Sequence, residues 1–189
     1  KAMFKSVPPE RLKLQLGCEL NEEFNLDDIM SHSFDAAFIG MGLPSAVRVT
    51  QQRMEGLVGA LDFLEKGKRG QLQLGGKRVA VVGGGNTAMD AAVMASKLGA
   101  EDVYVIYRRS FKQMPAWQTE RQRAVGMGVH FMILTQPLEY ISADGRLTGI
   151  RLCPTILGQP DESGRRRPIA RQESAYELPV DVVVEAIGQ

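Results

Sequence analysis

A glycine-rich segment in the middle of the chain has the residue types and the spacing needed to hold a phosphate group. It reads Gly83-Gly84-Gly85-Asn86-Thr87-Ala88. In a GxGxxA loop the first glycine permits a tight turn, the second leaves room for a pyrophosphate, and the alanine lets helix and strand pack closely. The following helix N-terminus adds unpaired N–H donors and partial positive charge. The segment therefore predicts a dinucleotide-binding loop; the alternative is a glycine turn that holds no ligand.

The elements on either side of this loop support the dinucleotide interpretation. A short apolar strand is predicted at 79–82, directly before the glycines, and an alanine-rich helix follows them and ends at Gly99. A second strand at 103–107 completes a βαβ unit. Because a GxGxxA pattern alone is weak evidence, the order of strand, turn and helix carries the prediction.

Two arginines follow the second predicted strand, at the point where an NAD-specific domain carries a carboxylate. That Asp or Glu binds the ribose 2′-hydroxyl of NAD. This chain has Arg108 and Arg109 instead, about 25 residues after Gly83. Guanidinium groups bind phosphate oxygens through a planar fork of donors. The pair therefore predicts a domain that binds NADP(H) through its 2′-phosphate; the alternative is that one or both arginines point into solvent.

The rest of the chain predicts an α/β domain with a parallel sheet and a β-rich excursion. Before the loop we expect a half-buried strand at 12–16, a short helix at 26–30 capped by Asn25, a buried strand at 34–39 and a helix at 57–67. After it we expect a helix at 116–125, strands at 129–134, 147–152 and 180–187, a hairpin turn at 144–145 and a polar loop at 161–168. Two βα units, an excursion and a final strand predict a Rossmann-like fold.

Composition excludes several classes of protein. The 189 residues are 44% hydrophobic and 24% charged, and 23 Lys and Arg face 22 Asp and Glu. This balance argues against a nucleic-acid binder, which would show a basic excess. No apolar run reaches about 18 residues, so no membrane-spanning segment is predicted. Cys18 and Cys153 form no CxxC pair, so we expect neither a disulfide framework nor a metal site. We also expect the protein to reside in a reducing compartment, the cytoplasm.

Four segments, taken together, resemble a known group of flavoproteins. They are residues 83–90, 103–109, 114–116 and 185–189. Their sequences and order resemble the small subunit of glutamate synthase and the NADPH-oxidising part of dihydropyrimidine dehydrogenase and related iron–sulfur flavoproteins. This resemblance covers nearly the whole chain and is densest from residue 76 onward. It implies an oxidoreductase in which hydride passes from NADPH to FAD, iron–sulfur clusters relay the electrons, and a larger catalytic subunit or domain is the partner.

In that group an NADPH domain is inserted into an FAD domain, and short glycine-containing motifs mark the two crossovers. Residues 40–42 resemble the first motif. Ala186-Ile187-Gly188 resembles the second motif, which the group places against the nicotinamide end of NADPH. No glycine-rich strand–turn–helix for an FAD pyrophosphate precedes residue 40. We therefore expect a remnant of an FAD-binding domain at 1–42 and an NADPH-binding domain at 43–189. FAD is expected on the intact protein and not on this fragment.

Other functions and residues give weaker predictions. A non-enzymatic dinucleotide-binding or subunit-scaffolding module remains an alternative, and a methyltransferase would leave Arg108 and Arg109 without a purpose.

His32 and His130 have no companion ligands and are expected to be structural. Residues 165–167 predict a solvated hairpin tip or a docking surface for an acidic neighbour. Asp90 is expected in the first turn of its helix, kept off the phosphates. No Ser–His–Asp set or metal-ligand cluster is predicted.

Overall fold

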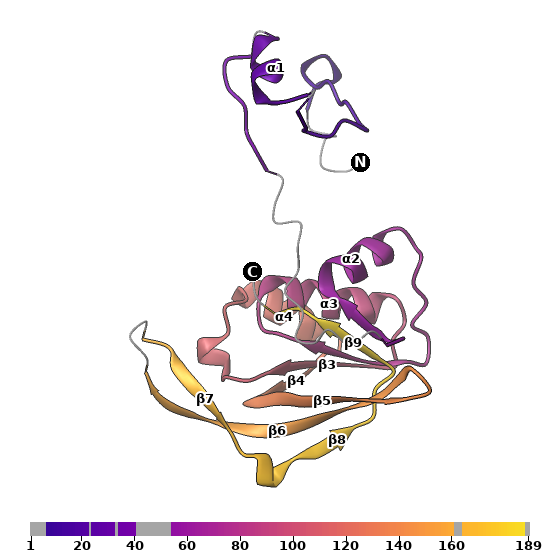
Figure 1. Ribbon diagram of the computed structural model, residues 1–189, viewed down its shortest axis with the longest axis vertical. Helices are drawn as coiled ribbons and strands as arrows, with labels where there is room; N and C mark the ends of the chain where they lie inside the picture. Colours follow the sequence, from indigo (N-terminus) through magenta and orange to yellow (C-terminus); the bar gives the residue numbers. More distant parts are fainter. Residues whose placement is uncertain (1–6, 23, 33, 41–53, 161–163, 188–189) are drawn as a thin grey trace. The chain divides into compact units, whose positions relative to one another are not determined.

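The chain divides into two compact units, residues 1–42 and 43–189. The computed structural model describes residues 7–22, 24–32, 34–40, 54–160 and 164–187, and its helices and strands are labelled in Figure 1. In this described part, no helix is both long enough and apolar enough to cross a bilayer.

The first unit contains one short helix with a well-formed N-terminus. After a single 3-10 turn, η1 (Pro9–Arg11), helix α1 runs over Leu26–Ser31. The Asn25 side chain accepts hydrogen bonds from the backbone N–H groups of Asp27 and Asp28, and the Asp28 carboxylate accepts one from the Asn25 N–H. This reciprocal capping box satisfies donors that a helix leaves unpaired. The predicted cap at Asn25 is confirmed.

The two strands predicted in this unit are wrong. Residues 12–16 and 34–39 form no strand, and most of their apolar side chains are exposed, with Leu16 at 80% and Phe38 at 98% of their full accessible surface. A β-strand needs a hydrogen-bonding neighbour, and no ladder of the described residues includes either segment. Of the first crossover motif, Gly40 is exposed, and residues 41 and 42 lie outside the described part.

The second unit is built on a five-stranded parallel sheet in the order β1-β9-β2-β3-β4. Its strands are β1 (Leu57–Gly59), β2 (Arg78–Val82), β3 (Asp102–Tyr107), β4 (His130–Ile133) and β9 (Val182–Glu185). The last strand of the chain, β9, lies between the first two, and Val79 pairs with both Val103 and Val182. The predicted α/β fold with a parallel sheet is confirmed.

The helix predicted at 57–67 begins later than expected. Residues 57–59 form β1, which pairs with β9 through Leu57 and Val183, and helix α2 occupies Ala60–Lys68. The apolar residues at 57, 58, 61 and 64 satisfy helical spacing, but sheet pairing decides the conformation of the first two. Gly67 lies inside α2 and does not end it.

Both faces of the parallel sheet are covered. Helices α2, α3 (Asn86–Lys97) and α4 (Gln118–Gly126) pack on one face, and an antiparallel sheet packs on the other (Figure 1). Val79 and Val81 contribute to the core beneath the helices, whereas Ala80 and Val82 contribute to the core shared with the second sheet. Burial on both faces explains why these strands read as continuous apolar runs.

The antiparallel sheet is larger than the sequence indicates. It contains β5 (Thr135–Ala143), β6 (Arg146–Pro160), β7 (Arg166–Ala170) and β8 (Tyr176–Leu178). Asp144 and Gly145 have φ angles of 50° and 76°, as a two-residue hairpin turn requires, so the predicted turn is confirmed. The loop predicted at 161–168 is wrong from residue 166 onward, because β7 pairs there with the extended end of β6. Residues 161–163 lie outside the described part.

Candidate functional site

A cavity of about 680 Å³ opens at the carboxyl ends of β2, β3 and β9. In open α/β sheets, ligands bind outside the carboxyl ends of the strands. The lining comes from the start of α2, the glycine turn, the end of β3, the start of β5, the β6–β7 hairpin and the end of β9. Of the residues predicted to bind a cofactor, the cavity is lined by Gly83, Gly84, Gly85, Asn86, Thr87, Arg108, Arg109, Ala186 and Ile187.

The three glycines of the turn are needed for different reasons. A Cβ on Gly83 would collide with the backbone carbonyl oxygen of Ala186, and a Cβ on Gly84 would collide with the ring of Tyr107. Gly83 also has a φ of 151°, which side chains disfavour. A Cβ on Gly85 would meet no protein atom within 4 Å. Gly85 is therefore the position where a side chain would fill the cavity without disturbing the fold.

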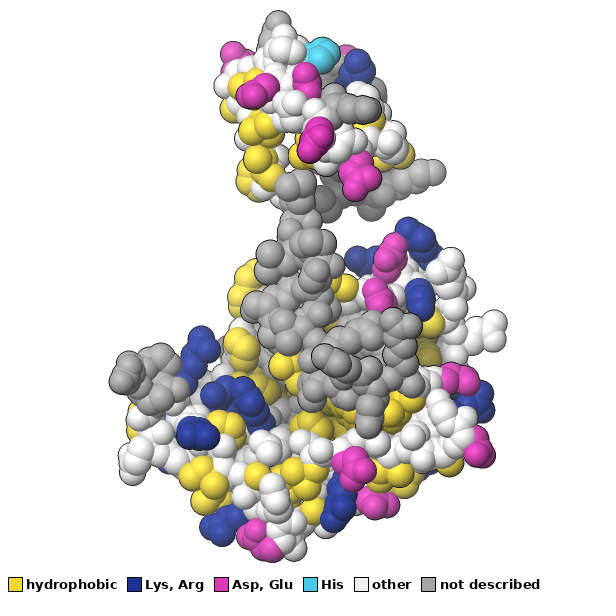
Figure 2. All heavy atoms as spheres, in the orientation of Figure 1, with side chains coloured by type: hydrophobic (Ala, Val, Ile, Leu, Met, Phe, Trp, Pro, Cys, Tyr) yellow, Lys and Arg dark blue, Asp and Glu magenta, His cyan; other side chains and the backbone are white. Residues whose placement is uncertain are grey.

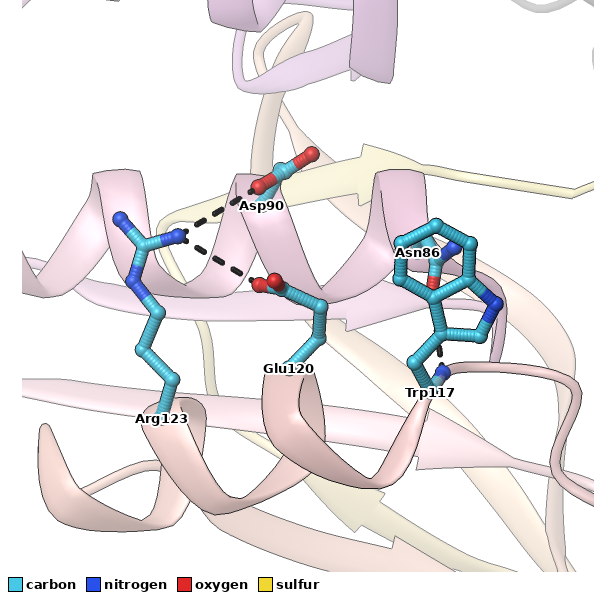
Figure 3. Close-up of polar contacts among 5 residues, drawn as sticks. All are labelled: Asn86, Asp90, Trp117, Glu120 and Arg123. Carbon is cyan, nitrogen blue, oxygen red and sulfur yellow. Dashed lines mark hydrogen bonds and ion pairs between the residues drawn. The ribbon is translucent and has the colours of Figure 1, made fainter.

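Helix α3 begins at this turn without a side-chain cap. Its N-cap is Gly85, which has no side chain to accept from the first N–H groups of the helix. The Asn86 side chain instead accepts a 2.9 Å hydrogen bond from the backbone N–H of Trp117, which holds the start of α4 near the turn (Figure 3). Thr87 lines the cavity, whereas Ala88 is fully buried and packs in the core beneath the helices.

Asp90 lies away from this turn, although not where we expect it from the sequence. It is the fifth residue of α3 and so falls beyond the first turn. Its carboxylate lies 4.0 Å from an Arg123 nitrogen, and the same nitrogen lies 3.4 Å from Glu120 on α4 (Figure 3). The first-turn prediction is therefore wrong, and the charge of Asp90 is instead paired with the neighbouring helix.

The antiparallel sheet braces the turn that carries the two arginines. The Thr155 hydroxyl donates to the backbone carbonyl of Arg108 at 2.8 Å, and the N–H of Leu134 donates to that of Arg109 at 3.0 Å. The Arg109 Nε donates to the backbone carbonyl of Arg166 at 3.0 Å. These bonds tie the end of β3 to β6, to the β4–β5 junction and to β7. Arg108 is exposed and Arg109 half-buried, and both line the cavity.

A third arginine, Arg165, reaches the same cavity from the β6–β7 hairpin. Figure 2 shows basic side chains gathered beside this hairpin. The neighbouring Arg166 donates to the backbone carbonyls of Leu157 and Gly158 at 2.7 and 2.8 Å and so closes the hairpin. The sequence predicts a solvated tip here. The sequence does not predict that Arg165 lines a cavity, because the hairpin and the end of β3 are far apart in the chain and meet only in the folded structure.

Glu185 is another cavity residue that the sequence does not predict. It ends β9, is only 3% exposed, and accepts a 2.9 Å hydrogen bond from the Tyr140 hydroxyl on β5. Burial, together with the adjacent Glu185 carboxylate, raises the pKa of Tyr140, so this hydroxyl stays protonated. The signal in the sequence that could have indicated this residue is a single carboxylate at the end of a run of buried valines. Side chains alternate along a strand, so position 185 faces the antiparallel sheet, as Val183 does.

The cysteines and histidines of the chain lie outside the cavity lining. Cys153 is buried on β6, and burial raises the pKa of its thiol, which favours the unreactive protonated form. His130 stacks on Tyr104 and lies 3.6 Å from an Asp102 oxygen, while His32 contacts the backbone carbonyl of Asp28. Within the described ranges, no group of three or more His, Cys, Asp or Glu is placed to hold a metal ion.

Comparisons with known proteins give both a family and relatives. Residues 15–189 match the protein family described as pyridine nucleotide-disulphide oxidoreductase. The beta subunit of NADP(+)-dependent formate dehydrogenase from Moorella thermoacetica is 39% identical over 178 residues, 90% of this chain and 25% of that protein. The small chain of NADPH glutamate synthase from Escherichia coli K12 is 32% identical over 191 residues, 94% of this chain and 40% of that protein. This chain therefore spans less than half of either relative.

Solved structures share the fold at lower identity. Thioredoxin reductase from Streptococcus pyogenes aligns with a TM-score of 0.53 at 18% identity, over 76% of this chain and 41% of that one. Putidaredoxin reductase, in its covalent complex with putidaredoxin, aligns with a TM-score of 0.52 at 16% identity, over 77% and 32%. At this identity the likeness establishes the fold alone.

The bond between Tyr140 and Glu185 gives a stability prediction. In Tyr140→Phe the buried carboxylate loses a donor, so the free energy of unfolding at pH 7 should fall by about 1–3 kcal/mol. The matched control is Tyr176→Phe on β8, a residue that is 38% exposed and should tolerate the change. Urea unfolding followed by circular dichroism measures both.

The same pair of variants predicts a pH dependence. Because folding raises the pKa of Tyr140, its contribution to stability is present below about pH 10 and is lost as pH rises above that value. Phenylalanine cannot titrate, so the difference between the wild type and Tyr140→Phe should shrink above pH 10. A difference that stays constant into that range would contradict this assignment.

Proposed function

Since this chain belongs to the pyridine nucleotide-disulphide oxidoreductase family, we propose that residues 43–189 bind NADPH at the carboxyl ends of β2, β3 and β9. The domain then presents the nicotinamide to FAD held by the rest of the protein. The observation that carries this proposal is the open space at Gly85, at an uncapped helix N-terminus that opens onto the cavity. The relatives named for NADP(+) or NADPH support this choice of cofactor.

The glycine turn suits a pyrophosphate. The first N–H groups of α3 need acceptors, and a bound anion supplies them while the helix dipole favours its charge. The bare backbone of Gly85 allows phosphate oxygens to approach. We assign this part of the site to Gly83–Thr87, with Ala88 providing the close packing of α3 on the sheet.

The arginines suit the 2′-phosphate that distinguishes NADPH from NADH. Arg108 and Arg109 line one side of the cavity and Arg165 joins them there. Guanidinium groups form charge-assisted hydrogen bonds with phosphate oxygens. Because the backbone of residues 108 and 109 is held by the antiparallel sheet, the ends of the side chains are presented from a fixed turn.

The other end of the site is assigned to the nicotinamide. Ala186 and Ile187 line the cavity just after β9, and Gly188 lies outside the described residues. When bound, NADPH supplies a hydride from its nicotinamide ring, and the chain contributes binding and orientation.

The electron route and the partners are part of the same proposal. We assign residues 1–42 to a remnant of the FAD-binding domain, and its exposed Leu16 and Phe38 favour cover by further protein. Electrons then continue to iron–sulfur clusters in a larger subunit or domain. Support comes from relatives that are named as a beta subunit and a small chain.

Gly85→Val should abolish NADPH binding while the fold survives. Its side chain would enter the space proposed for the pyrophosphate, where no protein atom lies within 4 Å. Gly126→Val, on the exposed face of α4, is the matched control and should bind normally. Calorimetric titration on variants with native circular dichroism is the measurement. Unchanged affinity in Gly85→Val would remove the turn from the site.

Alanine at Arg108 or Arg109 should weaken NADPH binding and leave NADH binding nearly unchanged. One charged hydrogen bond contributes roughly 1.5–3 kcal/mol, which corresponds to about 10- to 100-fold in affinity. Higher salt should also reduce NADPH affinity more than NADH affinity, because the contact is ionic and partly exposed. Arg167→Ala is the control: it is exposed on β7 and absent from the cavity lining. Equal losses for both nucleotides would contradict the NADP assignment.

A further inference from the structure

Glu185 lies at one end of the cavity in surroundings that carboxylates rarely occupy. It is 3% exposed at the end of an otherwise apolar strand and yet contributes to the cavity lining. An unpaired buried carboxylate is strongly unfavourable, so burial requires hydrogen-bond donors. The Tyr140 hydroxyl supplies one of them at 2.9 Å. Carboxylate oxygens are hydrogen-bond acceptors, so a ligand N–H group that enters the cavity beside Glu185 would meet one.

The order of the strands indicates which end of a dinucleotide reaches Glu185. The glycine turn follows β2, the arginines follow β3, and Glu185 ends β9, on the opposite side of β2. A dinucleotide whose pyrophosphate lies over the turn and whose 2′-phosphate lies toward Arg108 must therefore extend its other half toward β9. That half carries the nicotinamide and its carboxamide, a planar group with two N–H donors.

We propose that Glu185 is the residue that orients the nicotinamide, its carboxylate accepting a hydrogen bond from the carboxamide N–H group. This inference rests on the proposed NADPH site and adds a positioning residue to it. Tyr140 holds the carboxylate from the antiparallel sheet, so the acceptor is fixed before the ligand arrives. Fixing the carboxamide fixes the rotation of the ring about its glycosidic bond, and thus the face from which hydride leaves.

Three ligands separate this contact from the rest of the site. NADPH carries the full dinucleotide, adenosine 2′,5′-bisphosphate lacks the nicotinamide half, and the 3-acetylpyridine analogue of NADPH lacks only the carboxamide N–H group. In Glu185→Ala we expect NADPH affinity to fall about 10- to 100-fold, as for the loss of one charged hydrogen bond. Affinity for adenosine 2′,5′-bisphosphate should not change, and this ligand also reports that the variant is folded. Arg108→Ala should weaken both.

The analogue identifies the donor. Wild type should bind the 3-acetylpyridine analogue more weakly than NADPH, and Glu185→Ala should bind the two with similar affinity. Equal loss for NADPH and the analogue would show that Glu185 contacts another group and would overturn the proposal. Unchanged NADPH affinity, or an equal loss for adenosine 2′,5′-bisphosphate, would also overturn it while leaving the NADPH site in place. Failure of the wild-type chain to bind both NADPH and adenosine 2′,5′-bisphosphate would overturn the site and this inference together.

Discussion

The site depends on one close approach, that of Gly83 to the backbone carbonyl of Ala186, where no side chain fits. The adjacent N–H of Ala186 donates to the carbonyl of Val82 at 2.9 Å, so β2 and β9 end side by side. These residues are about a hundred positions apart in the sequence, because β9 is the last strand and enters the sheet between β1 and β2. The approach brings the glycine turn and the end of β9 into a single cavity.

The antiparallel sheet gives this cavity its polar groups. A parallel sheet with both faces buried offers apolar side chains along its strands and leaves chemistry to the strand ends. Here Thr155 and Arg166 hold the turn that carries Arg108 and Arg109, and Tyr140 holds Glu185. The β-rich excursion is therefore more than an insertion on the surface. It positions cationic groups at one end of the cavity and a buried carboxylate at the other, in keeping with a ligand that has an anionic end and an amide end.

Local patterns in the sequence are enough to predict the features that local physics determines. The capping box at Asn25, the strand–turn–helix around the glycines and the hairpin at 144–145 depend on neighbouring residues, and the structure contains all three. Features decided by distant partners were missed or wrong. Residues 57–59 are a strand because β9 pairs with them, and residues 12–16 are not a strand although they alternate. Arg165 and Glu185 join the cavity only through pairing of β6 with β7 and packing of β5 against β9.

In the proposed complex, one cavity holds NADPH with its two ends in a defined direction. The most direct measurement is a crystal structure of the chain with NADP+ bound. We expect the pyrophosphate over the N–H groups that begin α3, the 2′-phosphate within hydrogen-bonding distance of Arg108 or Arg109, and the nicotinamide beside residues 185–187. A nucleotide bound in the reverse direction, or outside this cavity, would contradict it.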